Sequence, residues 1–169
     1  AIDASGDSYR WWEYVSAAVV SGLKNLQPEM TYQVVLWQQD GPQAFPSGLR
    51  HIDESMRGEL ESFLKSAPLS GTADPGPAIE EALDDGPRHI IIITGQDLTD
   101  AQLEQITSQL EDESSLRIDV VMISANLPAQ LAQLAESHQG HAVELARTQV
   151  RMWMDDAAAA AEVEPAPAE

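Results

Sequence analysis

Residues 89–94, which read His-Ile-Ile-Ile-Ile-Thr, restrict the possible folds of this chain more than any other stretch. Consecutive β-branched residues favour a strand. The absence of polar alternation is typical of a central parallel strand that is covered on both faces. Parallel neighbours need a crossover connection, which is usually a helix. The run therefore predicts an α/β protein in which strands alternate with helices.

The rest of the chain carries that alternation. Further apolar runs of strand length lie at residues 32–38, 118–124 and 142–145. Stretches with helical spacing of apolar residues lie between them, at 9–26, 53–66, 78–83, 99–110 and 127–135. This order predicts a doubly wound, mostly parallel sheet with helices on both faces, a Rossmann-like arrangement. Residues 40–48 are rich in Gly and Pro, and they predict a loop with room for a short edge strand.

Helix boundaries and the end of the chain carry local signals as well. Thr99 and Gln102 have the spacing of a capping box, and Asn126 is expected to cap the helix that follows it. Near the end, Val150, Trp153 and Met154 suggest a last helix. The sequence then becomes an acidic tail or linker rich in Ala and Pro. The expected organisation is one α/β domain over residues 1–155, followed by a tail over 156–169.

The charge balance limits the classes of partner. The chain has 28 acidic and 9 basic residues and a formal net charge of −19. Such a field repels nucleic acid and anionic membrane surfaces, and it favours cations and basic partners. No apolar run approaches the roughly 20 residues that span a bilayer, so direct membrane insertion is not expected. The chain has no cysteine, which excludes disulfides, thiol catalysis and Cys-based zinc sites.

Three loops are expected at the carboxyl edge of the predicted sheet, where doubly wound proteins bind ligands. They are Asp3–Asp7, Gly71–Thr72 and Thr94–Asp97. In the first loop the oxygen-bearing side chains of Asp3, Ser5 and Asp7 alternate along the chain. Ligand sets made only of oxygen suit Mg²⁺, Ca²⁺ or Mn²⁺. The alternative for this loop is a solvated turn that caps a helix, since Ser and Asp are common N-cap residues.

Four segments together resemble the von Willebrand factor type A domain. They are Ile-Asp-Ala-Ser-Gly at residues 2–6, Ser-Gly-Thr at 70–72, Ile-Ile-Ile-Ile-Thr-Gly at 90–95, and a late helix with a closing glycine at 131–140. The resemblance implies a metal-ion-dependent adhesion site formed by Asp3, Ser5, Asp7 and Thr72. It also implies a binding module with a protein partner, whose acidic side chain completes the coordination of the cation.

The sequence departs from the family pattern at two positions of this site. The family's third strand usually ends Thr-Asp-Gly, but here Gly95 follows Thr94, and Asp7 takes the place of the second serine. One carboxylate is lost and another is gained close by. The site is either compensated, because a hard cation mainly needs charge and oxygen geometry, or a metal-free scaffold that uses the same face. If it is compensated, the direct carboxylate is expected to hold the cation more tightly and to weaken capture of a partner carboxylate.

Other chemistries that use an aspartate loop match less well. An EF-hand loop expects a glycine where Ser8 stands and a glutamate where Tyr14 stands. A phosphotransferase of the haloacid dehalogenase type expects a second aspartate where Ser5 stands. A non-enzymatic binding module is therefore the expected class, and an Asp-dependent hydrolase is the alternative from another class.

The N-terminus bears on how the chain is organised. Only Ala1 and Ile2 precede the candidate metal loop, whereas a strand needs roughly five residues. We therefore expect a truncated first strand and a chain cut from a longer protein. The composition of the tail favours a bacterial multi-domain protein of the cell envelope or another extracytoplasmic setting, and a cytoplasmic role is the alternative.

Overall fold

The computed structural model of the chain describes residues 1–24, 26–27, 29–51, 53–123, 125–146 and 148–149. Its strands form a single six-stranded sheet in the order β3-β2-β1-β4-β5-β6. They are β1 (Ile2–Asp3), β2 (Thr31–Trp37), β3 (Gln43–His51), β4 (His89–Thr94), β5 (Arg117–Ile123) and β6 (Ala142–Leu145). All neighbouring strands are parallel except β2 and β3. The predicted doubly wound, mostly parallel sheet is confirmed.

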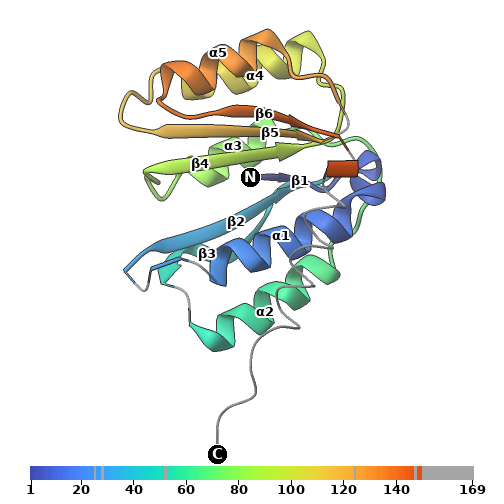
Figure 1. The fold of residues 1–169 in the computed structure, drawn as a ribbon, viewed down its shortest axis with the longest axis vertical. Coiled ribbons are helices and arrows are strands. Elements are labelled where there is room, and N and C mark those ends of the chain that lie inside the picture. Colours follow the sequence, from blue (N-terminus) through green and yellow to red (C-terminus); the bar gives the residue numbers. More distant parts are fainter. Residues whose placement is uncertain (25, 28, 52, 124, 147, 150–169) are drawn as a thin grey trace, which may run out of the picture.

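Helices pack on both faces of the sheet (Figure 1). One face carries α3 (Gly76–Leu83), α4 (Asp100–Leu110) and α5 (Ala129–Ser137), and the other carries α1 (Trp12–Lys24) and α2 (Glu54–Lys65). A 3-10 helix, η1 (Gly6–Arg10), lies between β1 and α1. None of the described helices is long and apolar enough to cross a lipid bilayer.

Two apolar clusters hold these layers together. Ile92 and Val120 of the sheet pack with Ile106 of α4 on the first face. On the second face, Leu36 of β2 lies in one cluster with Trp12 and Leu60 from the two helices there. Alternate residues of a strand point to opposite faces, so the central strands supply both clusters.

Of the two predicted helix caps, the one at α4 is observed and the one at α5 is not. The capping box at α4 is confirmed, because the Gln102 N–H donates to Thr99 Oγ1 at 3.3 Å and the Thr99 N–H donates to Gln102 Oε1 at 3.0 Å. The predicted Asn126 cap of α5 is wrong, because α5 begins after Pro128. The Leu127 N–H bonds instead to Glu144 Oε2 at 3.3 Å, and Pro128 has no N–H to satisfy.

Residues 40–48, expected to be a loop with room for a short edge strand, are mostly strand. β3 covers nine residues and pairs antiparallel with β2 at the edge of the sheet. An edge strand needs ladder hydrogen bonds on one side only, so it tolerates Pro46 and Gly48. The register shift between Tyr32 and Val34 of β2 marks where the pairing is irregular. The edge strand is therefore present, and it is longer than the Gly and Pro content indicated.

The isoleucine run is only partly covered, which corrects the expectation of a strand buried on both faces. Ile90 and Ile92 are buried under α3–α5. On the other face Ile91 of β4 is 44% exposed. Val143 of β6, on the far side of β5, is 42% exposed. Ile93, Val121 and Leu145 on the same face are partly buried against the second apolar cluster, so among the described residues this face is open only around Ile91 and Val143.

A charged cluster lies at the amino ends of β4 and β5. Asp119 Oδ2 contacts His89 Nε2 at 2.7 Å and Arg117 Nη2 at 3.1 Å, and Asp119 Oδ1 accepts from the His141 N–H at 2.6 Å. Burial by itself raises the pKa of Asp119. The hydrogen bonds from His141, His89 and Arg117 outweigh that effect and hold the pKa below its usual value.

We predict that Asp119→Asn lowers the free energy of unfolding by about 1–3 kcal/mol at pH 7, because it weakens charge-assisted hydrogen bonds. A depressed carboxyl pKa stabilises the fold above the pKa of the unfolded chain, and this contribution disappears as the pH falls through the folded-state pKa. The difference between variant and parent in urea unfolding should therefore shrink between pH 7 and pH 3. A difference that stays constant over this range would contradict the prediction, and Asp112→Asn on an exposed turn serves as the control.

Candidate functional site

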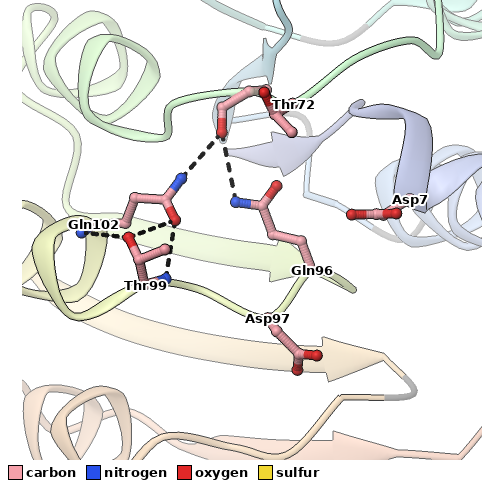
Figure 2. Close-up of a pocket in the computed structure, with 7 residues that line it drawn as sticks. Asp7, Thr72, Gln96, Asp97, Thr99 and Gln102 are labelled. Carbon is pink, nitrogen blue, oxygen red and sulfur yellow. Dashed lines mark hydrogen bonds between the residues drawn. The ribbon is translucent and has the colours of Figure 1, made fainter.

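The carboxyl edge of the sheet holds a pocket of about 350 Å³ (Figure 2). It lies among the loops that follow β1, precede α3 and follow β4. The lining residues are Asp7, Thr72, Ala73, Gln96, Asp97, Thr99 and Gln102. Two of the predicted ligands, Asp7 and Thr72, thus reach the same pocket although they are far apart in sequence.

A backbone contact brings the first two loops together. The Gly6 N–H donates to the Gly71 carbonyl at 2.9 Å. A Cβ on Gly6 would lie 3.3 Å from the Gly71 backbone, so this close approach favours a glycine at position 6. Gly71 itself has φ +62, a left-handed conformation that favours glycine. The side chains that follow these glycines, Asp7 and Thr72, are both exposed at the pocket.

Asp3 is fully buried and already hydrogen-bonded. Its Oδ1 accepts from the Ser5 N–H at 2.9 Å, and its Oδ2 accepts from Thr94 Oγ1 at 3.0 Å and from the Gly95 N–H at 3.4 Å. The carboxylate therefore ties the loop after β1 to the end of β4. Asp3 does not line the pocket.

Ser5 is also fully buried, but its side chain, unlike that of Asp3, is not hydrogen-bonded to any described residue. Its Oγ has no hydrogen-bond partner among the described residues. An unpaired buried hydroxyl costs about 1–3 kcal/mol, so native proteins usually give it a partner. The sequence had predicted Asp3 and Ser5 as equivalent ligands. The contacts separate them into an internally hydrogen-bonded carboxylate and a buried hydroxyl without a partner, and Ser5, like Asp3, does not line the pocket.

Trp11 explains why position 95 has no side chain. A Cβ built on Gly95 would lie 2.2 Å from Trp11 Nε1 and 2.5 Å from Trp11 Cε2. Trp11 is 2% exposed, so its indole has little room to move away. The indole thus fills the space that the family's usual aspartate would need. No local pattern in the sequence connects Trp11 with Gly95.

Gln96 is a pocket residue that sequence reasoning missed. It is 7% exposed, and its Nε2 donates to the Ala73 carbonyl at 3.5 Å. A carbonyl can only accept, so this contact directs the amide nitrogen toward Ala73 and leaves Oε1 free. Figure 2 shows the Gln96 amide below Thr72, on the side away from Asp7, whereas Asp97 is turned away from Thr72. The available sequence signal was its position two residues after the end of β4, inside the predicted loop Thr94–Asp97.

Gln102 supports the same carbonyl from α4. Its Nε2 donates to the Ala73 carbonyl at 3.2 Å, while its Oε1 accepts from Thr99 Oγ1 at 3.0 Å. Both ends of this amide are therefore occupied. Gln102 positions the rim and has no free group to offer a ligand.

The donors available at this edge are oxygens. Those that line the pocket are the carboxylates of Asp7 and Asp97, the Thr72 hydroxyl and the Gln96 amide oxygen, and the unpartnered Ser5 hydroxyl is buried in the loop before Asp7. This set fits a hard divalent cation better than a soft metal. Across the described ranges, no three or more His, Cys, Asp or Glu side chains are grouped as a metal site would need. Of the two exposed carboxylates that line the pocket, Asp97 is turned away from Thr72, so a cation next to Thr72 would depend on Asp7 and on neutral oxygens.

Comparison with known proteins gives matches by structure. No family model matches the sequence, and no curated protein matches it. The fold is similar to a von Willebrand factor type A protein from Catenulispora acidiphila, with a TM-score of 0.69 and 20% identity over 93% of this chain. The chain spans 40% of the length of that protein.

Two further structures are similar over nearly the whole chain. The SpRpn10 VWA domain gives a TM-score of 0.65 at 16% identity and covers 92% of this chain and 91% of its own. Proximal thread matrix protein 1 from the mussel byssus gives a TM-score of 0.63 at 16% identity over 95% of this chain and 44% of its own. Together with the sheet order and the loops at its carboxyl edge, these likenesses show that the chain has the fold of a von Willebrand factor type A domain.

Proposed function

We propose that this chain is a protein–protein interaction module that binds its partner at the carboxyl edge of the sheet, assisted by a divalent cation. The observation that carries the proposal is the meeting of Asp7 and Thr72 at one pocket, next to a loop in which the Ser5 hydroxyl is buried and unpartnered. The cation is Mg²⁺, with Ca²⁺ or Mn²⁺ as the alternatives. When bound, it would supply a coordination position for an acidic side chain of the partner.

The predicted ligands have different roles in this proposal. Asp7, Ser5 and Thr72 would donate oxygens to the cation, and Gln96 would add a neutral amide oxygen. Asp3 would act through the loop, because its two oxygens already accept three hydrogen bonds. Since Asp7 is a carboxylate where the family has a serine, the cation would be better neutralised and would hold a partner carboxylate less firmly.

The overall charge of the chain supports a cation as the bound species. A net charge of −19 raises the local concentration of cations and opposes nucleic acid and anionic membranes as partners. The alternative function is a metal-free scaffold that binds a protein at the same edge. The saturated hydrogen bonding of Asp3 and the loss of an acid at Gly95 favour that alternative.

The burial of Asp3 also argues against an Asp-dependent hydrolase. A nucleophilic carboxylate must reach the substrate, and Asp3 is 0% exposed with both oxygens hydrogen-bonded. The structures that this chain resembles are named for von Willebrand factor type A domains or for a thread matrix protein. We therefore expect binding without turnover.

Calorimetric titration of Mg²⁺, Ca²⁺ and Mn²⁺ tests the cation. We expect binding at a single site, weakened at least about tenfold by Asp7→Ala, because that substitution removes the exposed carboxylate ligand. Glu111→Ala changes the net charge equally at the exposed end of α4 that lies away from the pocket, and it should leave the affinity unchanged.

Gln96→Met is a second arm of the same titration. It keeps the side-chain volume and removes the amide oxygen. It should therefore lower the affinity for the cation less than Asp7→Ala does. If the parent chain binds none of the three ions at millimolar concentration, the cation-assisted function is wrong. The metal-free scaffold would then be the better description of this edge.

A further inference from the structure

The indole N–H groups of the three described tryptophans have different surroundings. Trp12 Nε1 donates to the Leu64 carbonyl at 3.0 Å. Trp37 Nε1 is enclosed and has no hydrogen-bond partner among the described residues. Trp11 Nε1 also has no partner in that part of the chain, but it is not one of the enclosed unpaired atoms. Trp11 is 2% exposed, and this small accessible surface therefore includes the one polar atom of its side chain.

Trp11 joins two loops of the candidate site. It caps the carboxyl end of η1, the short helix that contains Asp7. Its Nε1 lies 2.2 Å from the place of a Cβ on Gly95, the residue before Gln96. Asp7 and Gln96 both line the pocket, so the indole nitrogen lies where their loops meet. Any side chain at position 95 would occupy the space directly against this nitrogen, and glycine leaves it uncovered.

The chemistry of the indole limits what can bind it. An indole N–H donates a hydrogen bond and cannot accept one, so it does not coordinate a cation. A tryptophan N–H in a buried place usually has an acceptor, because an unpaired donor there is costly. Asp3, which accepts from the Gly95 N–H at 3.4 Å, does not accept from the indole. The acceptor must therefore come from outside the described residues, and a ligand oxygen is such an acceptor.

We infer that Trp11 Nε1 donates a hydrogen bond to the acidic side chain of the partner, and that Trp11 thereby distinguishes a carboxylate from an amide. The inference rests on the proposed function for the cation and for the acidic partner. A hydrogen bond to a carboxylate is about twice as strong as one to a neutral acceptor. This contact would add to the hold on the partner that the Asp7 carboxylate is expected to weaken at the cation.

The indole is fixed in position by the fold itself. The Trp11 N–H donates to the Ser8 carbonyl at 3.0 Å, and the Val15 N–H donates to the Trp11 carbonyl at 3.1 Å. The side chain packs in the second apolar cluster. Because η1 and α1 hold the residue from both sides, binding a partner would cost little ordering here.

The nearby acids make this contact depend on the cation. Asp3 and Asp7 belong to the loop that leads into η1, and their charges repel an incoming carboxylate. A bound cation would offset that repulsion. We therefore expect the indole to bind a carboxylate when the cation is present and to remain in contact with solvent when it is absent.

Nuclear magnetic resonance of the ¹⁵N-labelled full chain tests the inference directly, because each indole N–H gives its own signal. The probe is N-acetyl-aspartic acid α-amide, added in the presence of Mg²⁺. The Trp11 signal should move downfield, as expected for a new hydrogen bond, while the signals of Trp12 and Trp37 stay in place. N-acetyl-asparagine amide has the same size without the charge, and it should move the Trp11 signal far less.

Two matched variants measure the contribution to affinity. Trp11→Phe keeps an aromatic ring and removes the N–H, so it should weaken binding of the aspartate derivative at least about tenfold. Trp12→Phe removes the hydrogen bond to Leu64 and should leave that affinity unchanged. The two variants also assign the indole signals, and circular dichroism checks that each is folded. The titration of the parent chain does not depend on the stability of either variant.

The possible outcomes separate this inference from the proposed function. If the aspartate derivative moves the backbone signals of Thr72 and Gln96 but not the Trp11 indole, the inference is overturned and the cation-assisted site stands. Equal shifts from the asparagine derivative also overturn it. No change at this edge with either probe would make both proposals wrong. A Trp11 shift that persists in EDTA would support the indole contact and contradict the need for a cation.

Discussion

Gly95→Asp is expected to destabilise the domain by about 3 kcal/mol or more, although it restores the acid that the family usually has at this point. A Cβ at position 95 would overlap the Trp11 indole, and the new carboxylate would have to lie against that buried ring. Urea unfolding followed by circular dichroism measures the loss. We expect no gain in cation affinity, because the indole occupies the space where the carboxylate would coordinate.

Two companion variants identify the cause. Gly95→Ala adds only the Cβ and should account for most of the loss. Trp11→Ala alone costs about 3–5 kcal/mol by leaving a cavity, and adding Gly95→Asp to it should change stability by less than about 1 kcal/mol. A strongly non-additive cycle is the signature of direct contact. A Gly95→Asp protein as stable as the parent would show that the contact is absent.

Asp3→Ala should have the other large effect, a loss of about 3–5 kcal/mol in the free energy of unfolding. The substitution leaves the Thr94 hydroxyl and the N–H groups of Ser5 and Gly95 without their acceptor in a buried place. Asp7→Ala should cost less than about 0.5 kcal/mol, since Asp7 is exposed. Chemical denaturation of both variants and the parent measures the two losses in the free energy of unfolding.

This difference decides how the cation site should be probed. Loss of cation binding in Asp3→Ala would follow from a disordered loop as readily as from a missing ligand. Asp7→Ala removes a carboxylate without disturbing that loop, so it is the cleaner variant. Asp3→Asn keeps one acceptor oxygen and should fall between the two. Equal stability of Asp3→Ala and Asp7→Ala would show that the buried hydrogen bonds of Asp3 contribute little.

Local patterns predicted the central part of the fold well. The runs at residues 89–94 and 142–145 gave β4 and β6 with their observed bounds, and the Thr99–Gln102 spacing gave the start of α4. Each of these signals acts within a few residues. Edge positions follow weaker rules, so the strand character of β3 was hidden by its Gly and Pro residues.

The candidate site was predicted in its residue types and less well in their arrangement. A loop sequence shows that Asp3, Ser5 and Asp7 carry oxygens, but it does not show which of them the fold will bury. The contact between Trp11 and Gly95 joins distant parts of the chain and leaves no periodic signal. Gln96 was missed for a similar reason, because its role depends on the Ala73 carbonyl that orients its amide.

If the proposed cation binds at this edge, the Ala73 carbonyl bears on which ion is preferred. It accepts from both Gln96 and Gln102, and the Gly6–Gly71 hydrogen bond ties the remaining loop to the same rim. The rim is thus braced by contacts that involve no ligand, and filling the pocket would order few additional residues. Oxygens on a rim that is fixed in this way adapt poorly to ions of different radius. Mg²⁺ and Ca²⁺ differ in the oxygen distances they require, so this edge would discriminate between them by size more sharply than a flexible loop with the same oxygens.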